Sequence, residues 1–198
     1  MYKKMNSTIQ YYNEHAEEYF KETIDINIED FRKKFISLLP KNAKIIDIGC
    51  GSGRDVKAFS EMGYNAIGLD IAENLSATAK QHLNIDIIYE NMINWKSSEP
   101  FDGMWCCGSL LHLHDDELQS FLQNLKYNLK QDGIIFVSVK EGIPTGVNKD
   151  GRYFHNYTQN EICDILNKAG LKIIDIEITK DLLKRYNFQW LCIFARRV

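Results

Sequence analysis

The chain has 198 residues, of which 44% are hydrophobic, and its formal net charge at pH 7 is −3. This length suits one domain with a substantial core, and the charge does not indicate a general affinity for nucleic acid. The five cysteines lack framework spacing, and the chain has no apolar run of signal-peptide or transmembrane length. We therefore expect a cytoplasmic protein with reduced thiols and no membrane association.

The first 40 residues predict two helices. From Ser7 to Glu22, apolar and aromatic side chains recur at helical spacing, and they are Ile9, Tyr12, Ala16, Tyr19 and Phe20. A second helix is predicted from Ile28 to Leu39, with Asn27 as its N-cap and Pro40 directly after its end.

The stretch from Ile45 to Asp55 is the most informative part of the sequence. A short apolar run predicts a buried parallel strand, three glycines follow at alternate positions, and a helical pattern begins near Asp55. A strand, a glycine turn and a helix are typical of the nucleotide-binding corner of an open α/β sheet. Glycine can adopt positive φ there and lets the backbone approach a ligand closely. The dinucleotide fingerprint requires a further glycine where Arg54 stands, which disfavours NAD.

The rest of the chain predicts alternating helices and strands. The predicted elements are the helix 55–63, the strand 66–70, the helix 73–82, the strands 85–89 and 101–107, the helix 115–130, the strand 134–139, the helix 158–170 and the strands 171–179 and 188–195. This alternation indicates a parallel sheet with right-handed crossovers. No helix separates the last two strands, so we expect them to form an antiparallel hairpin. The loop from Lys140 to Tyr157 has the length of a functional loop.

The pattern Asp-x-Gly-x-Gly-x-Gly from Asp47 to Gly53, with Asp70 ending the next strand, resembles motif I and the acidic loop of the class I methyltransferases that use S-adenosylmethionine (SAM). The resemblance covers roughly residues 30–140. It implies an α/β fold with three layers, in which a doubly wound, mostly parallel sheet has seven strands and only the last is antiparallel. It also implies a single domain over residues 1–198. In that domain 1–40 form a helical lid, 41–139 bind the cofactor, and 140–198 form the substrate side.

The resemblance implies a set of cofactor-binding residues, which are Tyr12, Tyr19, Asp47, Gly49, Cys50, Gly51, Arg54, Asp70, Ile71, Asn91, Met92, Cys107 and Gly108. Asp70 would bind the ribose, Asp47 would orient the loop, and we expect Arg54 to meet the methionine carboxylate. Asn91 stands where the family usually has an acidic residue that accepts from adenine, and Glu90 is the alternative. Tyr12 and Tyr19 belong to a segment similar to the family's N-terminal lid, although a packing stripe is the other interpretation.

The catalytic candidates are His112, Arg152, Tyr153 and His155. His112 follows the fourth strand and is either a general base or a packing residue. The segment from Arg152 to Tyr157 resembles the Arg-Tyr-Tyr-His motif of tRNA wobble-uridine methyltransferases that esterify a carboxymethyl group. Alternatively, Arg152 forms a local ion pair and Tyr157 packs against the next helix. The spacing of His112 and His114 does not favour a metal site, so we expect no metal.

The expected function is transfer of the sulfonium methyl of SAM to an oxygen or nitrogen of a small molecule by in-line displacement, with S-adenosylhomocysteine as the product. One alternative is a tRNA-modifying enzyme, which would need a partner to supply RNA affinity. The other is a SAM-binding regulator without catalytic activity.

Overall fold

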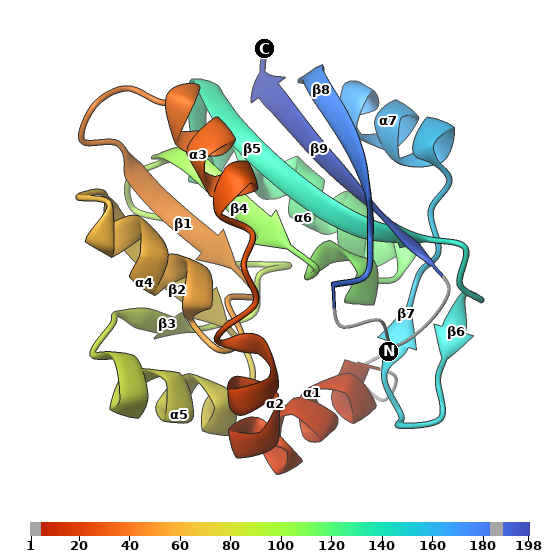
Figure 1. Cartoon of the computed structure of the whole chain (residues 1–198). Coiled ribbons are helices and arrows are strands. Elements are labelled where there is room, and N and C mark those ends of the chain that lie inside the picture. The colour runs from red at the N-terminus through yellow and green to blue at the C-terminus, as the bar shows by residue number, and fades with distance from the viewer. Residues whose placement is uncertain (1–4, 183–187) are drawn as a thin grey trace.

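The computed structural model describes residues 5–182 and 188–198, and its centre is a seven-stranded sheet (Figure 1). The strand order is β3-β2-β1-β4-β5-β9-β8. These strands are β1 (Lys44–Ile48), β2 (Asn65–Asp70), β3 (Ile87–Tyr89), β4 (Phe101–Cys107), β5 (Leu129–Glu141), β8 (Leu171–Lys180) and β9 (Gln189–Arg197). Within this sheet β9 runs antiparallel to both β5 and β8, whereas the pairings among β1 to β5 are parallel. The predicted fold class is therefore confirmed.

Helices cover both faces of the sheet (Figure 1). The helices are α1 (Met5–Glu14), α2 (Ala16–Thr23), α3 (Glu29–Ser37), α4 (Arg54–Glu61), α5 (Glu73–Leu83), α6 (Asp115–Asn128) and α7 (Gln159–Lys168). Successive side chains of a strand point to opposite faces. Trp105 in β4 therefore packs against Phe35 of α3 and Phe59 of α4, whereas its neighbour Cys106 belongs to the cluster that includes Phe121 of α6.

Several local details differ from the predicted elements. The N-cap of α3 is Ile28, and Asn27, the predicted N-cap, accepts from the N–H of Glu29 through Oδ1 at 2.9 Å. The N-terminal segment is two helices, because His15 lies between them with non-helical angles of φ −110° and ψ 25°. α6 begins at Asp115 as predicted, with His114 as its N-cap, but it ends at Asn128, and β5 begins at Leu129 and not at residue 134. The loop from Lys140 to Tyr157 contains a small hairpin of β6 (Gly146–Val147) and β7 (Tyr153–Phe154).

The N-terminal helices lie at the edge where the parallel strands end. α1 contacts α5 and β7, and α2 also contacts α5. The backbone N–H of Asn74, in the first turn of α5, donates to Asn13 Oδ1 of α1 at 2.9 Å. Ligands of open α/β sheets bind at the carboxyl ends of the strands, so α1 and α2 border the expected site. Within residues 5–182 and 188–198, no helix has the length and apolar character needed to span a bilayer.

Candidate functional site

The loop between β1 and α4 has a backbone that depends on glycine. Gly49, Gly51 and Gly53 have φ values of +67°, +53° and +74°, a region that residues with a Cβ rarely occupy. The N–H groups of Gly49 and Cys50 both donate to the carbonyl of Leu69, at 2.7 and 3.2 Å. These bonds hold the loop against the end of β2.

Asp70, the last residue of β2, supports the same loop through its carboxylate. Its Oδ2 accepts from the N–H of Gly51 at 2.8 Å, and its Oδ1 accepts from the N–H of Ala72 at 2.8 Å. Burial raises the pKa of Asp70, while these backbone donors act in the opposite direction. The carboxylate is thus fixed beside the glycine loop.

The loop also lies close to neighbouring segments. A Cβ added to Gly49 would lie 2.5 Å from the Cβ of Ser109, in the loop after β4. A Cβ added to Gly51 would lie 3.4 Å from Cε1 of Tyr19 in α2. The loop therefore forms a narrow cradle that side chains would fill.

Replacing Gly49 with alanine is expected to lower the free energy of unfolding by more than the about 1–2 kcal/mol that positive φ costs an L-residue, since the new methyl group meets Ser109. Gly63→Ala is the matched control, because Gly63 has φ +86° but no heavy atom within 4 Å of the added Cβ. Urea denaturation of both variants and SAM titration by calorimetry test this. Equal destabilisation in the two variants, with unchanged SAM affinity, would show that the close approach at Gly49 is unimportant.

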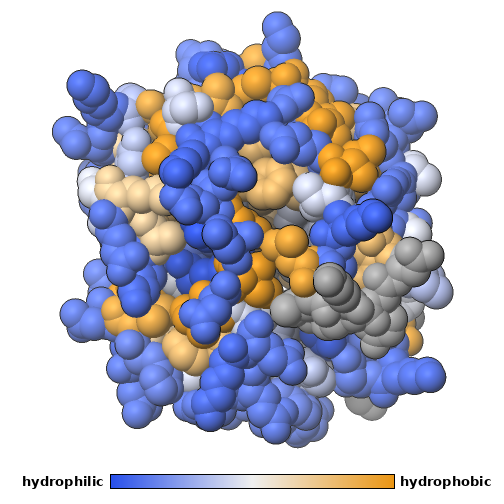
Figure 2. Space-filling model, in the orientation of Figure 1, coloured by the Kyte–Doolittle hydropathy of each residue, from blue (hydrophilic) through white to orange (hydrophobic). Residues whose placement is uncertain are grey.

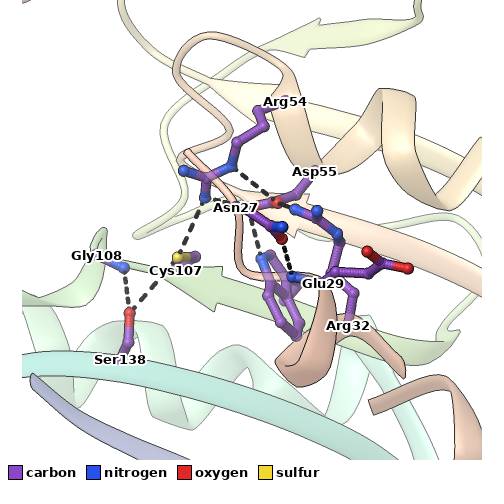
Figure 3. A network of polar contacts seen from close by, with 9 residues as sticks. Asn27, Glu29, Arg32, Arg54, Asp55, Cys107, Gly108 and Ser138 are labelled. Carbon is purple, nitrogen blue, oxygen red and sulfur yellow. Dashed lines mark hydrogen bonds and ion pairs between the residues drawn. The ribbon is translucent and has the colours of Figure 1, made fainter. Parts of the chain in front are cut away.

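A buried ionic cluster lies where α4 begins (Figure 3). Asp55 Oδ1 accepts from Arg32 Nη1 at 2.6 Å and from Arg54 Nε at 3.0 Å. Its Oδ2 accepts from Arg54 Nη2 at 2.7 Å and from Trp105 Nε1 at 3.0 Å. Burial alone would raise the pKa of Asp55, but the guanidiniums of Arg54 and Arg32 outweigh it and lower the pKa below its usual range. The cluster joins α3, α4 and β4 below the glycine loop.

A short chain of polar contacts continues from Arg54 across the sheet (Figure 3). Arg54 Nη2 lies 3.6 Å from Cys107 Sγ, which also accepts from Ser138 Oγ at 3.7 Å. The N–H of Gly108 donates to Ser138 Oγ at 2.8 Å. Burial raises the pKa of Cys107 to about 11, so this thiol is protonated at neutral pH. These polar contacts link the ends of β4 and β5 to Arg54.

A cavity of about 1100 Å³ opens at this edge of the sheet. Its walls come from the N-terminal helices, the glycine loop, the ends of β4 and β5, and the segment around β6 and β7. Figure 2 shows hydrophobic side chains in the middle of this face and hydrophilic ones around them. The residues predicted for the site that line the cavity are Tyr12, Tyr19, Asp47, Gly49, Cys50, Gly51, Arg54, Cys107, Gly108, His112 and Arg152.

Four predicted cofactor residues do not contribute to this lining, and they are Asp70, Ile71, Asn91 and Met92. The rings of Tyr12 and Tyr19 lie 4.9 Å apart and pack with Ala72 and Leu75, beside the end of β2. Asn91 Oδ1, at the end of β3, accepts from the N–H of Ile93 at 2.9 Å. The aromatic side chains of the N-terminal helices thus pack along this part of the strand edge.

Three side chains from distant segments meet at the other end of the cavity. His112 Nε2 lies 2.9 Å from Tyr12 Oη, and His112 Nδ1 lies 2.7 Å from the carbonyl oxygen of Tyr153. Arg152 Nη1 is 3.5 Å from Tyr12 Oη, and the same guanidinium is paired with Asp150. The sequence indicated His112 and Arg152 separately, but their link through Tyr12 depends on the tertiary structure.

Tyr153 and His155, which the sequence predicted at the substrate, are not among the residues that line this cavity. Arg152 and Phe154 line the cavity, and the residues between and after them point away from it, because side chains alternate along an extended segment. The ring of Tyr153 packs on His114 at 3.8 Å, and the ring of His155 stacks on Tyr157 at 4.2 Å. Tyr153 takes part in the site only through its backbone carbonyl.

Two charged residues of the site were missed by the sequence analysis. Asp55 was interpreted only as a helix start, although an acidic residue directly after Arg54 in a largely apolar segment was a usable signal. Lys140 is buried at the end of β5, with Nζ 4.3 Å from the ring centroid of Phe154 and 5.2 Å from that of Trp190. Nothing in the local sequence pattern distinguishes Lys140 from other lysines. In the described part of the chain, no group of three or more His, Cys, Asp or Glu residues is placed to hold a metal ion.

The fold and the site together define a class. A doubly wound sheet of this strand order, a glycine-rich loop after its first strand and a carboxylate at the end of its second strand are typical of the cofactor corner of a Rossmann-like methyltransferase. The glycine loop exposes backbone to the cavity at Gly49 and Gly51, and the carboxylate of Asp70 lies directly behind this loop. The residues present therefore fit this cofactor.

Comparison with known proteins agrees with this class. Residues 45–133 match a family model described as a methyltransferase domain. The chain is 20% identical to an uncharacterized methyltransferase of Staphylococcus carnosus, over 88% of this chain and 92% of that protein. It is 32% identical to the ubiquinone biosynthesis O-methyltransferase of Glaesserella parasuis, where the match covers 48% of this chain and 44% of that enzyme.

The fold is also similar to that of a Burkholderia thailandensis enzyme, 1,6-didemethyltoxoflavin-N1-methyltransferase, crystallised with 1,6-didemethyltoxoflavin and S-adenosylhomocysteine. The TM-score is 0.79 at 22% sequence identity, and the superposition covers 98% of this chain and 87% of that one. Residues 45–133 thus match a methyltransferase domain, and the fold resembles that of SAM-dependent methyltransferases, as the sequence motifs predicted.

Proposed function

We propose that this methyltransferase transfers the methyl group of SAM to an oxygen or nitrogen of a small molecule by in-line displacement. The observation that carries the proposal is the cavity, which extends from the glycine loop at Gly49 to His112 and Arg152. Its volume of about 1100 Å³ exceeds the roughly 300–1,000 Å³ of pockets for one drug-sized ligand, so a cofactor and a small acceptor fit together. Bound SAM supplies a methyl group on a positively charged sulfur, and alignment with the acceptor then contributes most of the rate.

At the cofactor end, we propose Asp70 for the ribose hydroxyls and Arg54 for the methionine carboxylate. Arg54 uses Nε and Nη2 for Asp55, which leaves the two N–H groups of Nη1 for a carboxylate. Asn91 Oδ1 accepts from the N–H of Ile93 with one lone pair, and its second lone pair is left for the adenine amino group. Its Nδ2 is left to donate to an adenine ring nitrogen.

At the acceptor end, the cavity combines aromatic rings with cations. Lys140 Nζ lies 4.3 Å from the centroid of Phe154, 4.6 Å from that of Phe188 and 5.2 Å from that of Trp190. The guanidinium of Arg152 lies 4.1 Å from the ring centroid of Tyr11. Walls of this kind suit a flat molecule with polar groups at its rim.

Similar proteins support a small acceptor. Their names include an O-methyltransferase of ubiquinone biosynthesis and an N1-methyltransferase crystallised with 1,6-didemethyltoxoflavin. One name specifies oxygen and the other nitrogen, which is why the proposal keeps both atoms.

Saturating SAM or S-adenosylhomocysteine is expected to raise the melting temperature, whereas NAD is not. At a free concentration of a hundred times the dissociation constant, a ligand that binds only the folded state stabilises it by about 2.7 kcal/mol. Differential scanning fluorimetry with the three ligands measures this. An equal response to NAD, or no response to SAM, would contradict the cofactor site.

The acceptor class is tested by measuring S-adenosylhomocysteine formation over a panel of phenols, catechols, aromatic amines and nitrogen heterocycles. Turnover of panel members supports the proposal. Turnover restricted to tRNA, with salt-dependent binding, would replace it with the tRNA-modifying alternative. Tight SAM binding without turnover of either class would favour a regulator.

A further inference from the structure

We propose that Tyr12 and His112 form a proton-accepting pair in which the Tyr12 hydroxyl meets the methyl acceptor and His112 takes up the proton. The inference rests on the proposed function and gives Tyr12 a catalytic role in place of simple packing. Both side chains line the cavity, and they come from residues 100 positions apart in the chain.

The hydrogen bonds of His112 determine its tautomer. A backbone carbonyl can only accept, so the contact of 2.7 Å between His112 Nδ1 and the oxygen of Tyr153 places a proton on Nδ1. Burial lowers the pKa of His112 to about 4, so the ring is neutral at neutral pH. A neutral ring with a proton on Nδ1 has its lone pair on Nε2, and Tyr12 Oη, at 2.9 Å, donates to it.

This arrangement decides which group an acceptor can reach. The basic lone pair of His112 is already bonded to the Tyr12 hydroxyl, so an acceptor in the cavity meets the oxygen of Tyr12 first. That oxygen keeps its own lone pairs, and Arg152 Nη1 lies 3.5 Å from it. Burial and the neighbouring Tyr19 raise the pKa of Tyr12, so a lasting tyrosinate is disfavoured and Tyr12 must pass its proton on as it receives another.

The proton transfers balance as follows. The O–H or N–H bond of the acceptor breaks as its proton moves to Tyr12 Oη, and the O–H bond of Tyr12 breaks as that proton moves to His112 Nε2. The acceptor atom gains the methyl group, and the positive charge ends on the imidazole ring. The lowered pKa of His112 makes this charged ring short-lived, so it passes the proton on to water while Nδ1–H stays bonded to the Tyr153 carbonyl.

Several charged and titratable groups face the pair from the surrounding elements. Arg152 and Lys140 lower the pKa of His112, and Asp150 acts in the opposite direction. Tyr19 and Asp70 raise the pKa of Tyr12, whereas Arg152 lowers it. A pH profile therefore has to be compared between variants that leave these five residues unchanged.

The test compares Tyr12→Phe, His112→Asn and the double variant, with Tyr127→Phe as a control for hydroxyl removal on the exposed side of α6. The first readout is the ¹⁵N spectrum of the histidine rings in the ligand-free protein. We expect His112 in the Nδ1–H tautomer, with an Nε2 shift that moves in Tyr12→Phe and stays in Tyr127→Phe. A protonated Nε2, or no response to Tyr12→Phe, would overturn the pair.

The second readout is kcat with an acceptor from the panel. Either single substitution should lower kcat about 10²–10⁴-fold, and the double variant should be no slower, since the two residues act as a unit. The wild-type rate should be flat between about pH 6 and 8, because His112 is already neutral there, whereas the variants should gain rate with rising pH as the acceptor loses its own proton.

The outcomes separate the two proposals. Wild-type kcat in Tyr12→Phe together with a slow His112→Asn variant would mean that the histidine contacts the acceptor directly, and it would overturn the relay alone. A slow Tyr12→Phe variant whose pH profile stays flat would show a merely structural role. A wild-type protein that binds SAM but methylates nothing in the panel would contradict the proposed function and the relay with it.

Discussion

Replacing Asp55 with alanine is expected to lower the free energy of unfolding by about 3–5 kcal/mol, the cost of removing one partner from a buried ionic cluster. The side chains of Asp55 and Arg32 are 4% and 9% exposed, so the substitution would leave the guanidinium of Arg32 buried without its partner. Two guanidiniums and the indole N–H of Trp105 would lose their shared acceptor. Urea denaturation measures the change as a lower midpoint at constant slope.

Two variants serve as controls for the Asp55 substitution. Glu61→Ala removes a carboxylate from the same helix, but that side chain is 67% exposed and its ion pair with Lys57 is long at 3.8 Å. We expect a change below about 0.5 kcal/mol there. Asp55→Asn keeps an acceptor oxygen, so its free energy of unfolding should fall less than that of Asp55→Ala. A loss below about 1 kcal/mol in Asp55→Ala would show that the cluster contributes little.

The same residue gives a pH dependence with a definite sign. The pKa of Asp55 is lower in the folded protein than its ordinary value of about 3.9 in an unfolded chain. The contribution of ionised Asp55 to the free energy of unfolding is therefore fully present above about pH 4, and it is lost as the pH falls through the folded-state pKa. Wild-type stability should fall towards Asp55→Ala stability in acid, and a constant difference down to pH 2 would contradict this.

Replacing Asp70 with alanine is expected to weaken SAM binding on the order of a hundredfold. A hydrogen bond to a charged group contributes about 1.5–3 kcal/mol, and the substitution removes the proposed ribose acceptor together with the support of the glycine loop. The carboxylate holds the N–H groups of Gly51 and Ala72, so the loop loses its fixed position beside β2. Calorimetric titration with SAM measures the dissociation constant.

Glu73→Ala is the matched control for Asp70, because it removes an exposed carboxylate three residues later, in the first turn of α5. It should leave the SAM affinity unchanged. Asp70→Asn keeps the volume and one oxygen, so it separates loss of charge from collapse of the loop. An Asp70→Ala variant that is folded and binds SAM as tightly as the wild type would remove the proposed ribose role.

The order and type of the secondary-structure elements were predictable from the sequence. Buried strands such as Ile45–Ile48 are short apolar runs, and the helices between them show a 3.6-residue period, so local pattern is enough to place both. The positive φ angles of the glycines at 49, 51 and 53 were also predictable from local sequence. Positive φ is a property of one residue and its neighbours, and the structure places all three glycines there.

The composition of the site was only partly predictable. Most of the glycine loop, Arg54 and His112 do line the cavity, whereas Tyr153 and His155 lie outside it. The roles assigned to the cofactor residues, and the division into lid, core and substrate side, stay predictions. The alternation of side chains along the segment at β7 depends on where the hairpin turns, and local sequence does not determine that turn.

By itself, the sequence determined the doubly wound α/β fold and the glycine turn from Gly49 to Gly53, because periodicity and glycine conformation are local properties. Only the tertiary structure decided that Asp55 joins Arg32 to Arg54, and that Tyr12 covers the free nitrogen of His112. These contacts join residues that are far apart in the sequence, and they form only when the segments that carry them pack together. The residues next to each partner in the sequence do not indicate which contact it will make.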